Sequence, residues 1–309
     1  MDNIVYQTNL YSQRNGKQNI NLTKKELYVF GINLVMSYIR YPRVRLYWSS
    51  ENGLRMDLIA DVMSVNRYEE ILRNLHFIEN PVGVRTKSNS TTKNSEDKMW
   101  KLRPFLDKLQ CNFMNAMDSK EYQSVDEQVI PMKSKISIKQ YLPKKPKKWG
   151  IKCWVRADTG GYVYRFEIYR GAKSRVAVSP LGACADVVLR LCDDIFHKNH
   201  KVFFDNLFCS ISLLDVLKSN GIYGTGTLRS NRMQGAKQIL PTDNIIKKEP
   251  RGTSYVATRN GTTITKWYDK APMLGKWTKL EQEGQDQDVT PPTILKKKES
   301  KTHLYGSEV

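Results

Sequence analysis

Two aspartates stand in strand-like segments, where carboxylates are uncommon. Asp126 lies inside the run 122–132, and Asp205 directly follows the short run 201–204. They are 205 − 126 = 79 residues apart, so they can meet only if the two strands lie side by side. Two converging carboxylates repel each other unless a cation lies between them, and Mg²⁺ or Mn²⁺ is the cation that oxygen ligands favour. Such ions hold the attacking and leaving oxygens in phosphodiester chemistry, which predicts a catalytic, metal-binding pair.

A purely structural role for each aspartate fits the same positions. Asp205 could cap the helix that follows it, because Asp is a favoured helix N-cap. Asp126 could form an ion pair with one of the lysines nearby in the sequence. Sequence position alone leaves the structural and the catalytic interpretations open.

A lysine-rich stretch lies between the two aspartates. It contains no Asp or Glu from residue 128 to residue 157, and Tyr141, Trp149 and Trp154 are interleaved with the lysines. Lysines neutralise phosphates and aromatic rings stack on bases, so this is a candidate DNA-binding face; a solvated, proline-stiffened loop is the alternative. Residues 144–148 also resemble a nuclear import signal. The candidate residues in this stretch are Lys133, Lys135, Lys139, Lys144, Lys145, Lys147, Lys148, Trp149 and Lys152.

The chain as a whole is strongly basic. Its 309 residues contain 50 Lys and Arg against 31 Asp and Glu, a net charge of +19. This excess attracts polyanions, of which nucleic acid is the commonest, although a solvated basic surface would give the same charge. A membrane partner is disfavoured, because the sequence shows no strongly amphipathic basic helix and no run of about 18 apolar residues.

Cysteine and histidine positions argue against disulfides and zinc. The five cysteines are odd in number and form no Cys-x-x-Cys pair, and residues 1–16 are too polar for a signal peptide, so we expect a reducing compartment. His197 and His200 are three residues apart, but no cysteine nearby completes a zinc finger. Both histidines are therefore predicted to lie at the surface, and no zinc is expected.

The order of the expected elements indicates an α/β chain. Residues 1–120 are predicted to be mainly helical, with a polar linker at about 84–97. Strands at 122–132, 150–157 and 162–168 precede a helix at 181–196, a strand at 201–204, a helix at 210–219 and a strand at 221–228. This order fits a mixed sheet with crossover helices, as in an RNase H-like fold or a generic Rossmann-like sheet.

Several segments resemble, in order and spacing, the signature motifs of piggyBac-type transposases. DEQVIPMKSKISIKQYLPKKPKKWGIKCWVRADTGGYVYRFEIYRG resembles the opening of the family's catalytic domain. VFFDNLFCSISLLDVL resembles its Asp-Asn-Phe-Phe-Thr-Ser block, and GIYGTGTLRSNR resembles its Gly-Thr-x-Arg-x-Asn-Arg strand. TKWYDK, at residues 265–270, resembles a later strand of an inserted β-subdomain. The resemblance extends from about residue 20 to residue 272.

The resemblance implies a domain order, a site and a partner. It implies a helical dimerisation and DNA-binding region over 1–120, an RNase H-like catalytic core over 121–230 and part of an inserted β-subdomain over 231–272. Asp126 and Asp205 would be the first two metal-binding catalytic carboxylates, with Mg²⁺ or Mn²⁺ as cofactor. Arg229 and Arg232 would join the lysines in binding DNA. Family members cut and rejoin DNA in the nucleus, which implies a nuclear DNA-binding protein that forms a homodimer.

The sequence departs from the family at its third catalytic aspartate. That residue lies in a Gly-Gly-Val-Asp motif, which does not occur here, and Asp269, Asp286 and Asp288 are poor substitutes. Residues 273–309 are polar and charged, which predicts a disordered basic tail. We therefore expect a domesticated DNA-binding protein with an incomplete metal site, impaired in DNA cleavage and strand transfer. The alternatives are an active Mg²⁺-dependent transposase and a non-catalytic protein-interaction scaffold.

Overall fold

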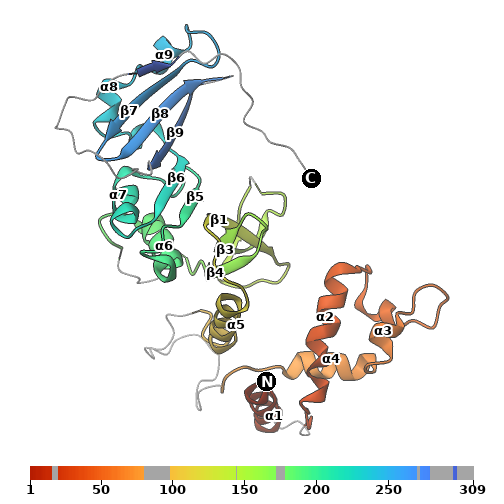
Figure 1. Cartoon of the computed structure of the whole chain (residues 1–309). Helices are drawn as coiled ribbons and strands as arrows, with labels where there is room; N and C mark the ends of the chain where they lie inside the picture. Colours follow the sequence, from red (N-terminus) through yellow and green to blue (C-terminus); the bar gives the residue numbers. More distant parts are fainter. Residues whose placement is uncertain are drawn as a thin grey trace. The chain divides into compact units, whose positions relative to one another are not determined.

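A computed structural model of the chain describes residues 1–15, 20–79, 98–143, 145–171 and 178–269, together with the backbone of 272–278 and 295–297. The chain divides into two compact units, Met1–Leu109 and Gln110–Val309 (Figure 1). The boundary between the units falls inside helix α5 (Arg103–Ala116). The predicted linker at 84–97 lies outside the described residues.

The first unit is helical, as predicted for this part of the chain. Its core contains Leu27, Val29 and Ile32 from the segment around α2, packed with Ile59 and Ile71. Besides the first part of α5, the unit contains α1 (Asp2–Arg14), η1 (Lys25–Tyr28), α2 (Val29–Tyr38), η2 (Val44–Trp48), α3 (Asp57–Ala60) and α4 (Val65–Asn74).

Helix α1 is not predicted from the sequence, and its buried side chains explain why. They are Ile4, Thr8 and Ser12, which lie on one helix face at four-residue spacing, but only one of them is apolar. Both hydroxyl groups have hydrogen-bond partners: Thr8 donates to the carbonyl oxygen of His76, after α4, at 3.3 Å, and Ser12 donates to that of Asn9, within α1, at 2.9 Å. A polar buried face of this kind gives no hydrophobic periodicity for sequence analysis to find.

The second unit is built on a mixed β-sheet. The central strand β1 pairs in antiparallel fashion with β3 and in parallel with β5, and β5 pairs in parallel with β6. The outer strands β2 and β4 both pair with β3 in antiparallel fashion. The strands are β1 (Tyr122–Pro131), β2 (Lys139–Tyr141), β3 (Trp149–Asp158), β4 (Val163–Ile168), β5 (Lys201–Phe204) and β6 (Tyr223–Thr227).

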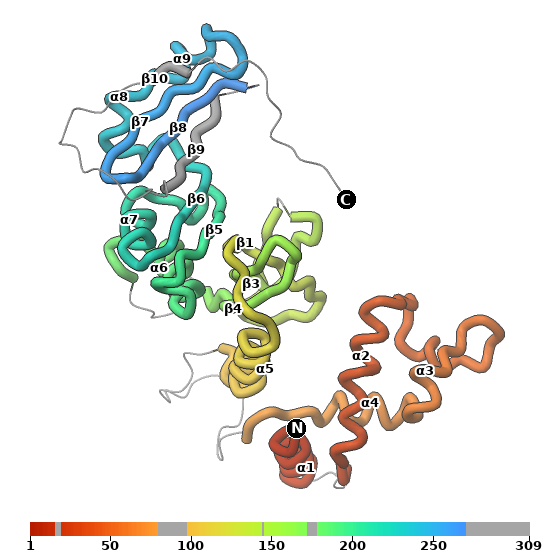
Figure 2. Tube along the Cα trace, viewed as in Figure 1, coloured from red at the N-terminus to blue at the C-terminus, as the bar shows by residue number. Residues whose placement is uncertain are grey.

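Helices connect the parallel strands, because parallel neighbours need a crossover. Helix α6 (Ala183–Cys192) and the 3₁₀ turn η3 (Asp193–Ile195) precede β5, and α7 (Ile211–Ser219) joins β5 to β6 (Figure 2). Val188, Leu213 and Val202 are fully buried in the core between these helices and the sheet. A Cβ atom at Gly224 would lie 2.2 Å from Cδ2 of Leu214, so a larger residue there would require the Leu214 side chain of α7 to move.

Further strands extend the sheet beyond β6. Strand β9 pairs with β6 and β8, so the order across the sheet is β10-β7-β8-β9-β6-β5-β1-β3-β2. Strand β9 lies almost wholly within the segment where sequence analysis expects a disordered tail, and its backbone is ordered by strand pairing on both sides. The remaining elements are η4 (Ser230–Arg232), α8 (Ala236–Ile239), α9 (Asp243–Ile246), β7 (Ser254–Arg259), β8 (Thr262–Tyr268), β9 (Pro272–Thr278) and β10 (Leu295–Lys297).

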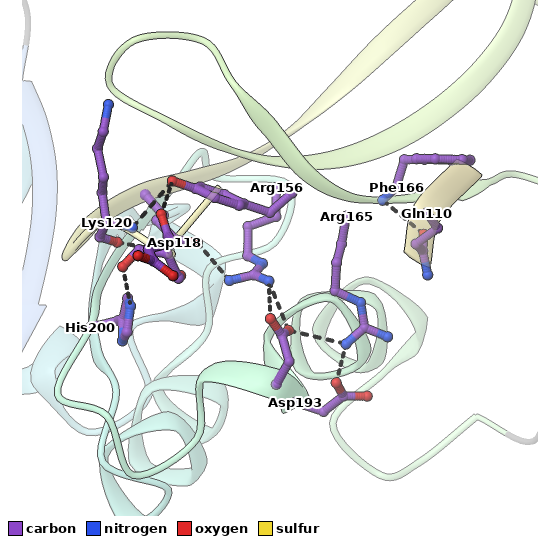
Figure 3. A network of polar contacts seen from close by, with 12 residues as sticks. Gln110, Asp118, Lys120, Arg156, Arg165, Phe166, Asp193 and His200 are labelled. Atoms are coloured by element: carbon purple, nitrogen blue, oxygen red, sulfur yellow. Dashed lines mark hydrogen bonds and ion pairs between the residues drawn. The ribbon is translucent and has the colours of Figure 1, made fainter. Parts of the chain in front are cut away.

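A buried ionic network joins β3 and β4 to the turn after α6 (Figure 3). The Arg156 side chain is fully buried and donates to both carboxylate oxygens of Asp194, at 2.7 and 2.6 Å. Arg156 also donates to Oε1 of Gln123 in β1 at 2.6 Å. Arg165 pairs with Asp193 and, at 3.2 Å, with Asp194. The network therefore ties three neighbouring strands to one turn.

One of the two histidines predicted to lie at the surface is buried. His197 is exposed, but His200 is only 7% exposed because it lies immediately before β5, next to the segment that enters β1. Its Nε2 lies 3.4 Å from the carbonyl oxygen of Ser119, and its Nδ1 has no hydrogen-bond partner. His200 ends a short polar run in the sequence, which is typical of a surface turn. The sequence does not show that the strand after it, β5, lies between β1 and β6 in the sheet.

Candidate metal site and nucleic-acid interface

The parallel pairing of β1 and β5 brings the two predicted aspartates together. The last residue pair in the register is Val125 with Phe204, so Asp126 and Asp205 come next on the two neighbouring strands. Alternation along the strands puts Val125 and Phe204 in the core and both aspartates on the exposed face. The two carboxylates, which are 79 residues apart in the sequence, thus lie at the same level of one sheet.

Neither aspartate has the structural role proposed as the alternative. Oδ1 of Asp126 accepts a hydrogen bond from the backbone N–H of Glu127 at 2.7 Å, and among the described residues no lysine forms an ion pair with Asp126. Oδ1 of Asp205 accepts from the backbone N–H of Leu207 at 2.7 Å. The cap of α7 is instead Ser210, whose hydroxyl accepts from the N–H of Leu213 at 3.2 Å. Within the described residues, no hydrogen bond or ion pair is found for the second oxygen of either carboxylate.

This donor set fits a hard divalent cation. Mg²⁺ is commonly bound through one or two carboxylates, with waters and substrate phosphates completing its octahedron. Asp126 and Asp205 would hold it, and when bound it would polarise a phosphodiester and offset its negative charge. Within the described parts of the chain, no group of three or more His, Cys, Asp or Glu side chains is arranged to hold a metal ion. A third protein ligand is therefore not found in this part of the structure.

The two predicted DNA-binding arginines lie beside the loop that follows Asp205. Arg232 donates from one nitrogen to the carbonyl oxygens of Asn206, Leu207 and Cys209 at 3.2, 3.1 and 3.0 Å. The Nε of Arg229 donates to Oδ1 of Asn206 at 3.2 Å. These hydrogen bonds hold the loop that follows Asp205 in place. Sequence analysis predicts DNA binding for the two arginines but not this structural role. Their binding to DNA stays a prediction.

The lysine-rich stretch forms a hairpin next to the carboxyl end of β1. Its strands β2 and β3 pair, and β1 and β5 both point their carboxyl ends toward this side of the sheet. Lys144 lies outside the described residues. Four of the predicted lysines are exposed and form no ion pair with any carboxylate of the described residues: Lys133, Lys135, Lys147 and Lys148.

The other lysines of this stretch already have partners within the protein. Lys152 is mostly buried and forms a 2.8 Å ion pair with Glu127. Lys145 donates to the carbonyl oxygen of Glu127 at 3.1 Å, and Lys139 donates to that of Lys133 at 3.0 Å. A lysine held by a carboxylate has less net charge to offer a phosphate, so the four exposed lysines are the strongest candidates for DNA contacts.

Charged and aromatic side chains lie on the same exposed face as the aspartates, nearer the start of β1 and β5. The Tyr122 and Phe203 rings stack with centroids 6.3 Å apart, and both are about two-fifths exposed, at 44% and 40%. Lys201 lies 4.5 Å above the Tyr122 ring, and its hydrogen bond to Glu121 raises the pKa of its ammonium group above the usual value. Sequence analysis does not single these residues out, although the alternation along β1 places Tyr122 on the face of Asp126.

The sequence matches a known family over nearly its whole length. A family model described as Transposase IS4 matches residues 1–301. Human PiggyBac transposable element-derived protein 3 is 30% identical over 273 residues, which are 87% of this chain and 44% of that protein. Human PiggyBac transposable element-derived protein 2 is 29% identical over 275 residues, with the same coverage of 87% and 44%. The chain thus spans less than half the length of these two relatives.

A solved structure supports the predicted fold class. The fold is similar to that in the cryo-EM structure of a piggyBac transposase synaptic complex with hairpin DNA, with a TM-score of 0.72 and 22% identity. The similar region covers 94% of this chain and 60% of that one. The prediction of an α/β chain with an RNase H-like core is therefore confirmed, and the Rossmann-like alternative is not. In the described residues, no helix is long and apolar enough to cross a membrane.

Proposed function

Because the chain belongs to the piggyBac-type transposase family, we propose that it is a transposase-derived DNA-binding protein whose 309 residues alone are impaired in cutting and rejoining DNA. The observation that carries the proposal is the exposed, acid-free lysine hairpin beside a two-carboxylate site. The similar piggyBac transposase was solved with hairpin DNA, which supports DNA as the partner.

The DNA-binding part of the proposal rests on charge that remains available to phosphates. Lys133, Lys135, Lys147 and Lys148 are exposed. Each phosphate neutralised by such a lysine releases condensed counterions from duplex DNA, so binding depends on salt. Four contacts would give a slope of log affinity against log salt of about −3.6, or a loss of roughly 100-fold between 50 and 200 mM.

Fluorescence anisotropy with a labelled duplex, repeated over a series of NaCl concentrations, tests this part. We expect affinity to fall with a slope of about −3.6 or steeper. Binding that does not change with salt, or an absence of binding at 50 mM NaCl, would refute a DNA-binding function based on this hairpin.

The proposed impairment rests on two observations: the described residues supply two carboxylates to this site, and the sequence has no Gly-Gly-Val-Asp motif. Two carboxylates and their waters bind Mg²⁺ less tightly than three, and they fix fewer of the positions that an in-line displacement needs. The alternative, an active transposase, is favoured by the alignment of Asp126 and Asp205 across β1 and β5.

Nicking of supercoiled plasmid with MgCl₂ or MnCl₂ separates the two functions. The variants Asp126→Ala and Asp205→Ala define the background, because each removes one of the two ligands. We expect the unmodified chain to nick no faster than these variants. Metal-dependent nicking that disappears in both variants would establish the active enzyme and overturn the proposed impairment.

A further inference from the structure

A shallow hollow beside the lysine hairpin has the chemistry of a nucleotide-binding surface. It is open to solvent, has a volume of about 520 Å³ and is lined by Lys135, Ile136, Lys139 and Trp149. Tyr141 stands directly opposite Trp149 in the β2–β3 pairing, so the two side chains share one face of the hairpin. The lining therefore combines one aromatic ring with two lysines, and a second ring lies next to it on the same face of the hairpin.

Both aromatic rings are about half exposed to solvent. Trp149 is 54% exposed and Tyr141 is 50% exposed, with ring centroids 4.8 Å apart and planes tilted by 44°. Trp154, five residues further along β3, is only 9% exposed and packs in the core. Ile136, at 39% exposure, adds another apolar group to the same surface. Exposed aromatic surface of this extent beside a functional face marks a binding site more often than a solvated surface.

The two lysines lie where they could bind phosphate groups next to these rings. Nζ of Lys139 lies 5.3 Å from the centre of the Trp149 ring, and its backbone partner, the carbonyl oxygen of Lys133 at 3.0 Å, holds it there. Lys135 lines the same hollow, and no Asp or Glu occurs between residues 128 and 157. The Trp149 ring and the positive charges of Lys135 and Lys139 therefore line the same hollow, where one nucleotide could contact all three.

An unpaired nucleotide matches this combination best. Its base presents an open face for stacking, and its phosphates lie next to that base along the strand. A regular duplex offers phosphates, but its bases are already stacked on one another. An acidic peptide would match the lysines and leave the apolar rings without a partner.

We propose that Trp149 and Tyr141 form a stacking site for an unpaired base, with Lys135 and Lys139 binding the flanking phosphates. The inference rests on the proposed DNA-binding function and deepens it, because it states that the preferred DNA contains a single-stranded segment. Base–aromatic stacking is tolerant of sequence, so the site would select DNA structure and not a particular base.

Two DNA probes of equal length, assayed with the full chain, test the site. One is a complete duplex, and the other carries a four-nucleotide single-stranded gap with 2-aminopurine as one of its unpaired bases. We expect tighter binding to the gapped probe and quenching of 2-aminopurine fluorescence on binding. Trp149→Ala should weaken gapped-probe binding by about 5- to 150-fold and remove the quenching, while duplex affinity changes by less than about 3-fold.

Further variants separate stacking from loss of structure. Trp149→Phe keeps a smaller ring and should retain part of the quenching, and Tyr141→Ala should reduce it if the second ring takes part. Ile245→Ala, at an apolar side chain that is 52% exposed in α9 of the same unit as the hairpin, is the control and should change neither probe. Far-UV circular dichroism checks that each variant is folded.

The possible outcomes separate the stacking site from the proposed DNA-binding function on which it rests. The stacking site would be overturned if Trp149→Ala left both gapped-probe binding and quenching unchanged. If duplex binding were still salt-dependent, the proposed function would stand. Absence of binding to either probe would overturn both. Equal affinity for the two probes with no quenching would show that the hairpin binds phosphates only.

Discussion

Replacement of Arg156 by Ala is expected to lower the free energy of unfolding by about 3 kcal/mol, one of the largest single-residue effects in the second unit. The Arg156 side chain is fully buried, and its guanidinium group is held by both oxygens of Asp194 and by Gln123. Removing it leaves a carboxylate and an amide facing a void. The loss lies at the low end for a broken buried pair, because Asp194 is 24% exposed and keeps a contact with Arg165.

Arg190 provides a matched control for this variant. It also binds a carboxylate through two nitrogens, to Glu167 at 2.8 and 2.9 Å, but its side chain is 39% exposed and that of Glu167 is 26% exposed. Water competes for such a pair, so Arg190→Ala should cost less than about 1 kcal/mol. Urea unfolding followed by circular dichroism measures both variants. Equal losses would show that burial does not determine the strength of these pairs.

A third variant separates charge from packing. Arg156→Met restores most of the apolar volume of the side chain and leaves Asp194 without its main partner. If the ion pair holds the network, Arg156→Met should remain destabilised by more than half of the Arg156→Ala loss. Full recovery of stability would mean that apolar packing of the Arg156 side chain, and not its ion pair, supplies most of the effect.

The strands that carry the two aspartates could be predicted because their signals are local in the sequence. The run 201–204 is predicted to be a strand and forms β5 over the same residues, and the predicted strand 122–132 is β1 apart from its last residue. Once these two strands pair in parallel, Asp126 and Asp205 must be neighbours, since each occupies the next place along its strand. The family resemblance supplies the pairing that periodicity alone leaves open.

Features that depend on distant partners could not be predicted in this way. Arg156 appears in the sequence as one more cation of a basic strand, and only the fold brings Asp194 to it. His200 resembles a surface histidine until β5 is seen to lie between two other strands. Strand β9 lacks a clear sequence signal because its order comes from pairing with β6 and β8. In each case tertiary contacts outweigh local propensity.

Neutralising the four exposed lysines of the hairpin is expected to weaken duplex binding by at least about 100-fold at 100 mM NaCl. The variant is Lys133→Gln, Lys135→Gln, Lys147→Gln and Lys148→Gln combined, which lowers the net charge from +19 to 19 − 4 = +15. Each lost phosphate contact should also reduce the salt slope by about 0.9, or about 3.6 in total. Stability should change little, because the four side chains are exposed and unpaired with carboxylates of the described residues.

The control must change the net charge equally at other places on the same unit. Lys198, Lys237, Lys247 and Lys248 are exposed and lie outside the hairpin, so their combined replacement by Gln also gives 19 − 4 = +15. At 100 mM NaCl the Debye length is about 10 Å, so lysines that do not touch DNA contribute little to affinity. The control should therefore keep the salt slope of the unmodified chain. An equal loss in both variants would show that DNA responds to the basic surface as a whole, and that the aromatic hairpin beside Asp126 and Asp205 is not a dedicated contact.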